Sequence, residues 1–219
     1  MRTLCVVARR PEAGRSKTRL CPPLQPVQAA TLYSAFLRDV LVTMRRVPDV
    51  EYVIAHAEAD AADYFVALAP DMRRVVQRGA DLGARLAAIV ADEFAAAATA
   101  VAVLSSDSPN LPAEFLSAAF ARLDEGYDAV FGPCDDGGYY LGAVRAPHLP
   151  LFTTPTMSSA TTLAETLALA ETLRLRVALL PHWYDVDYVA DLERLRADLA
   201  REDGRAAPHT WAMLSELEL

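Results

Sequence analysis

The chain has 219 residues, of which 53% are hydrophobic and 23% charged, and its formal net charge at pH 7 is −8. This composition is typical of a globular protein rather than a disordered one, and the acidic balance argues against a general nucleic-acid-binding protein. No linker rich in Ser, Gly or Pro divides the chain, so we expect residues 1–219 to form a single domain.

The three cysteines, Cys5, Cys21 and Cys134, are odd in number and form no C-x-x-C pair. A disulfide framework or a cysteine zinc site is therefore not expected, and reduced thiols indicate a cytoplasmic protein. No signal-peptide pattern follows Met1 and no apolar stretch reaches about 18 residues, so we expect no membrane association.

Apolar runs and helical periodicity alternate along the chain. The first apolar run, residues 4–8, is typical of a buried parallel strand. Further strands are expected at 52–57, 73–77, 100–104, 128–131, 139–144 and 176–180. Helices are expected at 29–44, 59–68, 84–98, 112–123, 158–173, 189–199 and 211–217. This alternation predicts an α/β fold with three αβα layers and a mostly parallel sheet, in which 100–104 lies in the interior and 139–144 is a small antiparallel insertion.

The loop after the first strand is basic although the protein as a whole is acidic. Five cations lie within eleven residues: Arg9, Arg10, Arg15, Lys17 and Arg19. Ligands of open α/β sheets bind at this end of the strands, and a loop with free N–H groups, here around Gly14, suits a di- or triphosphate. The alternative interpretation is a solvated basic turn.

Carboxylates follow two later strands at the same predicted edge of the sheet. Asp107 follows the strand 100–104, and Asp185 and Asp187 follow the strand 176–180. Mg²⁺ (or Mn²⁺) takes one or two protein oxygens together with substrate phosphate and water, so these residues are candidate metal ligands. Alternatively, Asp107 serves a turn or cap before the helix at 112, and Asp185 or Asp187 caps the helix at 189.

Two other polar segments have open interpretations. Asp135 and Asp136 precede Gly137 and Gly138, which suits either a functional loop or a simple hairpin turn. His182 is either an acid–base group or an ordinary satisfied histidine. The chain contains no G-x-x-x-x-G-K-[ST], no H-E-x-x-H and no nucleophile elbow, which argues against P-loop and hydrolase chemistry.

Five separated motifs occur in a fixed order: residues 11–20 (PEAGRSKTRL), 79–83 (GADLG), 106–111 (SDSPNL), 132–141 (GPCDDGGYYL), and 185–187 (DVD) with Asp191 and Leu192. In order and spacing they resemble bacterial glycosyltransferase A-like proteins, some of them linked to arsenosugar biosynthesis, over almost the whole chain to about Leu195. More distantly, the chain is similar to phospholactate and molybdenum-cofactor guanylyltransferases. The resemblance implies the nucleotide-diphospho-sugar transferase fold, which is GT-A-like.

The resemblance also implies roles for individual residues. The residues implied to bind the nucleotide are Ala8, Arg9, Gly14, Lys17, Arg19, Gln77, Asp81 and Gly83. The implied metal ligands are Asp107 and Asp187, with Asp185 as a third candidate. The residues implied on the acceptor side are Asp136, Gly137, Gly138 and Tyr139. Lys17, Arg19 and Asp107 would carry catalysis by stabilising phosphate-centred charge.

Two departures from the family pattern concern the phosphates and the acceptor. Arg9 and Arg10 stand where the family usually has lysine. A planar, forked guanidinium therefore replaces the compact charge of an ammonium group. Residues 156–159 (TMSS) lack the usual tryptophan, so the acceptor can differ from that of the family.

These features predict a metal-dependent transferase that uses a nucleotide-activated donor. Glycosyl transfer from a nucleotide sugar to a small acceptor is the first expectation. The alternatives are nucleotidyl transfer from a triphosphate to a phosphorylated small molecule, which the basic loop favours, and a non-catalytic nucleotide-binding protein. The expected partners are the donor and a small-molecule acceptor, with no nucleic acid and no membrane, and a homodimer is the candidate oligomer.

Overall fold

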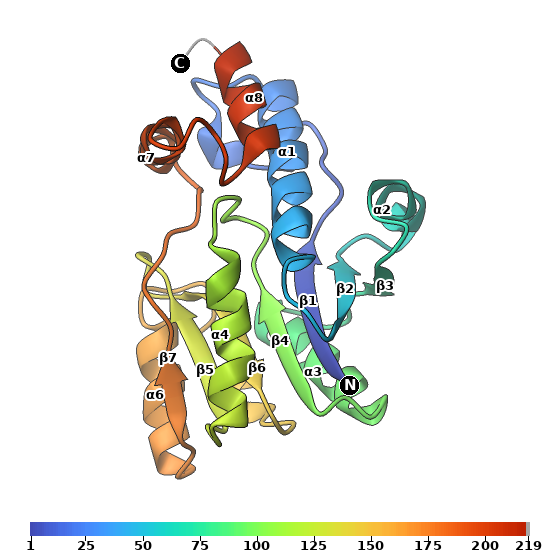
Figure 1. The fold of residues 1–219 in the computed structure, drawn as a ribbon, viewed down its shortest axis with the longest axis vertical. Helices are drawn as coiled ribbons and strands as arrows, with labels where there is room; N and C mark the ends of the chain where they lie inside the picture. Colours follow the sequence, from blue (N-terminus) through green and yellow to red (C-terminus); the bar gives the residue numbers. More distant parts are fainter. Residues whose placement is uncertain (218–219) are drawn as a thin grey trace.

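The computed structural model describes residues 1–217, whose strands form one mixed sheet (Figure 1). The strands are β1 (Arg2–Ala8), β2 (Val50–His56), β3 (Arg73–Val76), β4 (Ala100–Leu104), β5 (Ala129–Pro133), β6 (Tyr139–Val144) and β7 (Val177–Leu179). They lie in the order β3-β2-β1-β4-β6-β5-β7. Neighbouring strands are parallel except at β6, which pairs antiparallel with both β4 and β5. The predicted antiparallel insertion and the interior position of β4 are confirmed.

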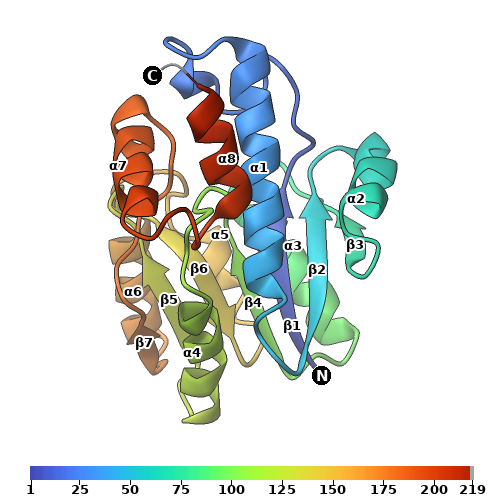
Figure 2. The same cartoon turned by 45° about the horizontal axis from the view of Figure 1, so that its top comes forward.

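Helices cover both faces of this sheet, as the two ribbon views show (Figure 1, Figure 2). The core on one face is shared by α1 (Pro26–Met44), α2 (Ala62–Leu68), α4 (Ala113–Asp124), α7 (Val189–Ala200) and α8 (Pro208–Glu216). The core on the other face is shared by α3 (Leu82–Ala95), α5 (Pro150–Thr153) and α6 (Thr162–Thr172). Two short 3₁₀ turns are η1 (Thr18–Leu20) and η2 (Ala59–Ala61). The predicted three-layer α/β fold is confirmed.

Strand β1 shows why the central strands are apolar throughout rather than alternating with polar residues. Leu4 and Val6 belong to the core on the α1 side, whereas Cys5 belongs to the core on the α3 side. Successive side chains of a strand point to opposite faces, so a strand covered by helices on both faces needs apolar residues at every position.

Several helix starts differ from those predicted, and α1 and α6 show the physical reasons. Helix α1 begins at Pro26, three residues earlier than expected, because proline at the first helical turn needs no N–H partner and the Gln28 side chain accepts the N–H of Gln25 at 2.8 Å. Helix α6 begins at Thr162 instead of residue 158. Ser158 has a left-handed φ of 58°, and the Ser159 N–H donates to Oγ1 of Thr162, so the chain turns before the helix starts.

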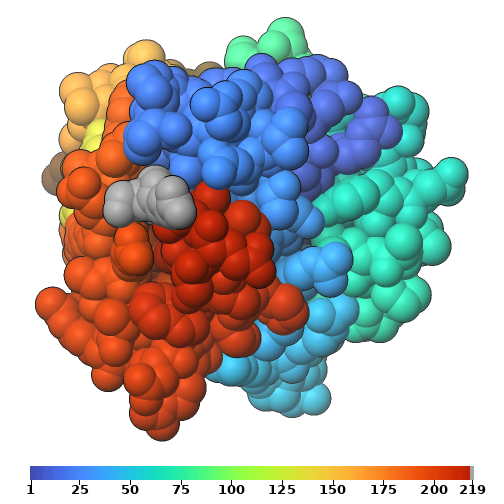
Figure 3. All heavy atoms as spheres, turned by 90° about the horizontal axis from the view of Figure 1, so that it is seen from above, coloured from blue at the N-terminus to red at the C-terminus, as the bar shows by residue number. Residues whose placement is uncertain are grey.

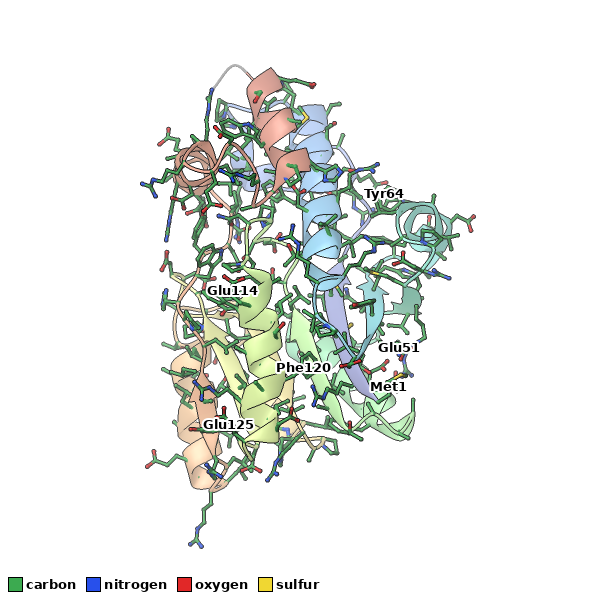
Figure 4. The ribbon with its side chains drawn as sticks, viewed as in Figure 1. Met1, Glu51, Tyr64, Glu114, Phe120 and Glu125 are labelled. Atoms are coloured by element: carbon green, nitrogen blue, oxygen red, sulfur yellow. The ribbon has the colours of Figure 1, made fainter. Side chains whose placement is uncertain are left out.

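The carboxyl ends of β1 and β4 point to one edge of the sheet, at the top of Figure 1. Helix α4 starts near this edge, since Glu114 lies at its upper end and Glu125 at its lower end (Figure 4). Met1 and Glu51 lie toward the lower end of the sheet (Figure 4). From above, N-terminal residues in blue lie beside C-terminal residues in orange and red (Figure 3). No helix among residues 1–217 is both long and apolar enough to cross a membrane.

Candidate active site

Two adjoining cavities open at this edge. The larger has a volume of about 490 Å³ and is lined by the ends of β1 and β3 and by the basic loop. The smaller, of about 300 Å³, is lined by residues from β4, the β5–β6 hairpin and the segment before α6. The residues that line both cavities are Val7, Arg19, Leu82, Asp107, Ser158 and Asp187.

Lys17 lies between the loops that end β1, β4 and β7. Its Nζ is 2.5 Å from Oδ1 of Asp107 and 2.9 Å from Oδ1 of Asp187, and its side chain is only 6% exposed. Its backbone is left-handed, with φ 48°, and the preceding turn is held by the N–H of Ser16 on the carbonyl of Glu12 at 3.0 Å. Burial disfavours the ammonium charge, but the two carboxylates outweigh burial and raise the pKa of Lys17 above its ordinary value.

The sequence left open whether Asp187 caps the helix that begins at residue 189, and in the structure Asp191 takes that role. The carboxylate of Asp187 can therefore face the basic loop. Asp191 Oδ2 accepts the N–H groups of Asp187 at 3.1 Å and of Tyr188 at 2.7 Å, at the start of α7. Asp187 Oδ2 then accepts a hydrogen bond from Arg19 at 2.9 Å. Burial opposes ionisation, but Lys17 and Arg19 lower the pKa of Asp187 below its ordinary value.

Asp107 is held beside Asp187 by the backbone as well as by Lys17. The N–H of Val186 donates to the carbonyl of Asp107 at 2.9 Å, which ties the loop after β4 to the loop after β7. Ser105 Oγ accepts the N–H of Asp107 at 3.1 Å and lies 3.2 Å from its Oδ2. Pro112, not Asp107, occupies the N-cap of α4. Asp107 therefore shapes a local turn and also presents its carboxylate to both cavities.

Asp185 lies deeper and has neutral partners. Ser108 Oγ donates to its Oδ1 at 2.6 Å, and Cys134 Sγ lies 3.5 Å from its Oδ2. Burial and the charge of Asp107 raise the pKa of Asp185 to about 7, against the lowering effect of the Ser108 hydrogen bond. Asp185 lines only the smaller cavity.

The donor set at this point fits a divalent cation. The Lys17 ammonium contacts an oxygen of Asp107 and an oxygen of Asp187 at once, so these two carboxylates can share one positive charge. Two carboxylate oxygens beside a phosphate site are the usual protein contribution to Mg²⁺ or Mn²⁺. Within residues 1–217 no cluster of three or more His, Cys, Asp or Glu side chains forms a ready metal cage, so the remaining ligands would come from substrate and water.

The residues predicted to bind the nucleotide fall into two groups. Those that line the larger cavity are Ala8, Arg9, Lys17, Arg19 and Gln77. Gln77 is fixed there because its Nε2 donates to the carbonyls of Ala8 at 3.2 Å and Ala55 at 2.7 Å.

The structure does not bring the other three residues of that prediction to the cavity wall. Gly14 lies in the turn of the basic loop with φ 76°. Asp81 caps α3 by accepting the N–H of Ala84 at 2.8 Å. Gly83 packs against α5, where an added Cβ would lie 2.3 Å from the carbonyl oxygen of Phe152. The local structure thus gives Gly14 a role in a turn, Asp81 a capping role and Gly83 a position in close packing.

The predicted acceptor loop is at once a turn and part of a cavity wall. Asp136, Gly138 and Tyr139 line the smaller cavity, and Oδ1 of Asp136 accepts the N–H of Gly138 at 2.8 Å. Gly137 has φ 84° and lies against Ala160 rather than in the cavity lining.

His182 and Asp135 lie outside both cavities and pair with each other. His182 Nδ1 is 2.9 Å from Asp135 Oδ1, and Asp135 also pairs with Arg194. The open acid–base interpretation of His182 therefore has no support in its position.

Several wall residues had no signal in the motifs. Tyr33 of α1 follows the apolar spacing of its helix, yet its hydroxyl bonds with Ser106 Oγ at 2.8 Å and accepts the N–H of Arg9 at 3.3 Å, beside the larger cavity. Burial raises the pKa of Tyr33 to about 12. A hydroxyl on an otherwise apolar helix face was the available signal. Arg85 also lines the larger cavity and belongs to no motif. Met157 lines the smaller cavity and lies in residues 156–159, the segment related above to the acceptor.

The family model described as "Uncharacterized protein conserved in bacteria (DUF2064)" matches residues 40–159. The chain belongs to this family. A crystal structure from Desulfovibrio desulfuricans G20, assigned provisionally as a nucleotide-diphospho-sugar transferase, is 32% identical, with a TM-score of 0.89 and coverage of 98% of this chain and 94% of that one. The predicted nucleotide-diphospho-sugar transferase fold is confirmed.

More distant structures share the fold of this DUF2064 protein. CMP:2-keto-3-deoxy-manno-octonic acid synthetase complexed with CTP is 14% identical, with a TM-score of 0.59 and coverage of 92% of this chain and 99% of that one. Rv0371C of Mycobacterium tuberculosis H37Rv in complex with manganese is 18% identical, with a TM-score of 0.54 and coverage of 89% and 97%. A search of curated protein sequences finds no significant match.

Proposed function

We propose that this protein is a metal-assisted transferase that takes its transferred group from a nucleotide-activated donor, with a nucleotide sugar as the first candidate. The observation that carries the proposal is the position of Asp107 and Asp187, which Lys17 bridges, where the larger and smaller cavities meet. A donor in one cavity and an acceptor in the other would meet at this point.

The charge of the larger cavity supports a phosphate-containing donor. Its cations are Arg9, Arg15, Lys17, Arg19 and Arg85, and its acids are Asp107 and Asp187. In a protein of net charge −8, a wall with this balance would concentrate a di- or triphosphate. The CTP complex of one fold relative and the manganese complex of another are in keeping with such a ligand and metal.

The chemistry follows from where negative charge develops. When the bond to the transferred group breaks, charge accumulates on the leaving phosphate oxygens, and cations already in place stabilise it. A divalent cation held by Asp107 and Asp187 would neutralise part of that charge. Lys17 and Arg19 would bind the same phosphate oxygens, and the cavity walls would orient donor and acceptor, so no protein nucleophile is required.

Glycosyl transfer is placed first because the 32% identical relative bears a sugar-transferase assignment and because the smaller cavity adjoins the phosphate site. Nucleotidyl transfer is the second candidate. The five cations favour it, because with the same metal bound a departing pyrophosphate carries more negative charge than a departing nucleoside diphosphate.

Thermal unfolding against nucleoside triphosphates and nucleotide sugars, each with Mg²⁺ and with chelator, tests the proposal. A ligand at about 100 times its Kd adds about 2.7 kcal/mol, which corresponds to a shift of several degrees. A magnesium-dependent shift with one nucleotide sugar supports glycosyl transfer, and a shift with a triphosphate alone supports nucleotidyl transfer. Binding that is unchanged when Asp107 is replaced by Ala and metal is removed would contradict metal-assisted transfer.

A further inference from the structure

The two cavities differ in the sign of their charge. The charged residues that line only the larger cavity are all cations: Arg9, Arg15, Lys17 and Arg85. Those that line only the smaller cavity are both acids, Asp136 and Asp185. The remaining three, Arg19, Asp107 and Asp187, line both.

The shared residues leave no free positive charge for the smaller cavity. Arg19 is its only cation among the described lining residues, and NH1 of Arg19 is 2.9 Å from Oδ2 of Asp187. The Arg19 guanidinium also lies 5.3 Å from the centre of the Tyr188 ring. The positive charge of Arg19 is therefore already balanced by Asp187, so an anion in the smaller cavity would meet no unpaired cation among the described lining residues.

The two acids that line only this cavity have no cationic partner among residues 1–217. Asp136 accepts the N–H of Gly138, whereas its neighbour Asp135 is the residue that pairs with Arg194 and His182. Asp185 accepts from Ser108 and lies beside Cys134, both neutral. Protonation of Asp185 would remove one charge but would leave the sign of the cavity unchanged, because Asp136 remains.

The rest of the wall combines apolar side chains with hydroxyl groups, several of which are already hydrogen-bonded. The apolar side chains include Leu86, Val103, Leu104, Phe152 and Met157. Ser159 Oγ and Thr162 Oγ1 both donate to the carbonyl of Thr156, at 2.9 and 2.7 Å. Unpaired carboxylates accept hydrogen bonds from hydroxyl and ammonium groups and repel phosphates and carboxylates.

We infer that the acceptor is an uncharged or cationic hydroxyl compound with an apolar face, and that the smaller cavity rejects phosphorylated and carboxylated acceptors. The inference rests on the proposed function, which makes this cavity the acceptor side. It disfavours the phosphorylated acceptor that the nucleotidyl alternative was expected to use. Specificity of this kind arises from repulsion of the wrong ligand as much as from attraction of the right one.

A methyl group in the wall provides a readout that needs no turnover. Met157 is the only one of the five methionines that lines the smaller cavity. Protein with ¹³C-methyl methionine would be titrated with matched sets built on glycerol, ribose and glucose, each as the alcohol, the amine and the phosphate ester. We expect the Met157 methyl resonance to shift with alcohols or amines at concentrations lower by about tenfold or more than with the phosphate esters. An equal or stronger response to the esters, or no response to any alcohol or amine, overturns the inference.

Substitutions at two neighbouring residues test whether the charge of Asp136 causes the preference. Asp136→Asn keeps an oxygen for the N–H of Gly138 but removes the charge, and it should bring the response to phosphate esters closer to that of the alcohols. Asp135→Asn is the matched control, which should keep the wild-type order because Asp135 does not line the cavity. The same response in both variants overturns the inference. Absence of turnover with every donor would instead contradict the proposed function, and turnover with a phosphorylated acceptor would contradict only the inference.

Discussion

The ammonium nitrogen of Lys17 lies 2.5 Å from Oδ1 of Asp107, so the basic loop after β1 contacts the acidic loop after β4 directly. Asp187 contacts the same nitrogen at 2.9 Å. The Lys17 ammonium therefore occupies the position between these two carboxylates that we propose for a divalent cation.

Lys17 and a metal ion therefore compete for the same carboxylates. We expect Lys17→Gln to bind Mn²⁺ about tenfold or more tightly than wild type without nucleotide, because removal of the ammonium leaves two unpaired carboxylates. The electron paramagnetic resonance signal of free Mn²⁺ measures this affinity. Arg122→Gln, which disrupts a surface pair with Glu125, is the control and should bind like wild type. Weaker Mn²⁺ binding by Lys17→Gln would refute the competition.

Asp107→Ala should abolish metal-dependent turnover while the protein stays folded. The variant removes one of the two carboxylates that we propose to hold the metal, and loss of one such electrostatic partner costs about 10²-fold or more in rate. Turnover with a donor found by thermal shift measures the effect, and circular dichroism checks the fold. Full activity in this variant would exclude Asp107 from the metal site.

Asp39 stabilises the C-terminal helix from inside α1. Its buried carboxylate accepts the N–H of His209 at 3.1 Å and of Thr210 at 2.7 Å, so it caps α8 across the core. Asp39→Ala leaves these donors without a partner and should lower the free energy of unfolding by about 2–4 kcal/mol. Urea denaturation measures the loss. Asp39→Asn, which keeps one oxygen acceptor, should lose less, and equal losses would show that the hydrogen bonds are not the cause.

Asp128 should make stability depend on acid pH. It accepts the N–H of Arg176 at 2.8 Å and pairs with Arg145 at 2.6 Å, and the Arg176 hydrogen bond, with Arg145, lowers the pKa of Asp128. A carboxyl with a lowered pKa in the folded state stabilises the protein above its unfolded pKa and loses that contribution as the pH falls.

Asp128→Asn should therefore reduce the free energy of unfolding by about 1–2 kcal/mol at pH 7, with a smaller difference from wild type below about pH 4. Urea denaturation of both proteins across this range is the measurement. A difference that stays constant down to the lowest pH at which wild type is folded would contradict the role of the charge.

Alanine substitutions at Gly137 and Gly14 distinguish the stability cost of backbone strain from that of steric contact. Both have positive φ, 84° and 76°, but a Cβ at Gly137 would lie 2.1 Å from the carbonyl oxygen of Ala160, whereas a Cβ at Gly14 meets nothing within 4 Å. Gly14→Ala should cost about 1 kcal/mol from strain alone, and Gly137→Ala should cost more. Thermal unfolding of the two variants gives the comparison, and equal costs would argue against the close contact.

Much of the fold could be predicted because the strands are short apolar runs covered on both faces. β4 begins and ends as predicted, and the antiparallel position of β6 follows from the short connection between β5 and β6. Convergence of the loops at one edge was also predictable, since carboxyl ends of parallel strands share an edge.

Contacts between distant residues could not be predicted from local patterns. The bridge from Lys17 to Asp187 depends on a left-handed lysine and on Asp191, not Asp187, at the start of α7. Gly83 belongs to the GADLG motif and was expected to bind the nucleotide, but it packs against Phe152, because the approach of α5 to α3 is set by tertiary packing. Arg85 belongs to no motif and reaches the larger cavity only through the fold.

The antiparallel strand β6 brings a later part of the chain to the smaller cavity. The residues that line only the larger cavity lie within 8–106, and the same part of the chain also gives the smaller cavity Leu86, Val103, Leu104 and Ser105. The β5–β6 hairpin and the segment that follows it add Asp136, Gly138, Tyr139 and Met157 to the smaller cavity alone. Substitutions at these later residues can therefore change the smaller cavity while leaving the basic loop, Lys17 and Asp107 in place. In related proteins, changes in this part of the chain would alter the proposed acceptor cavity and keep the residues that we propose to activate the donor.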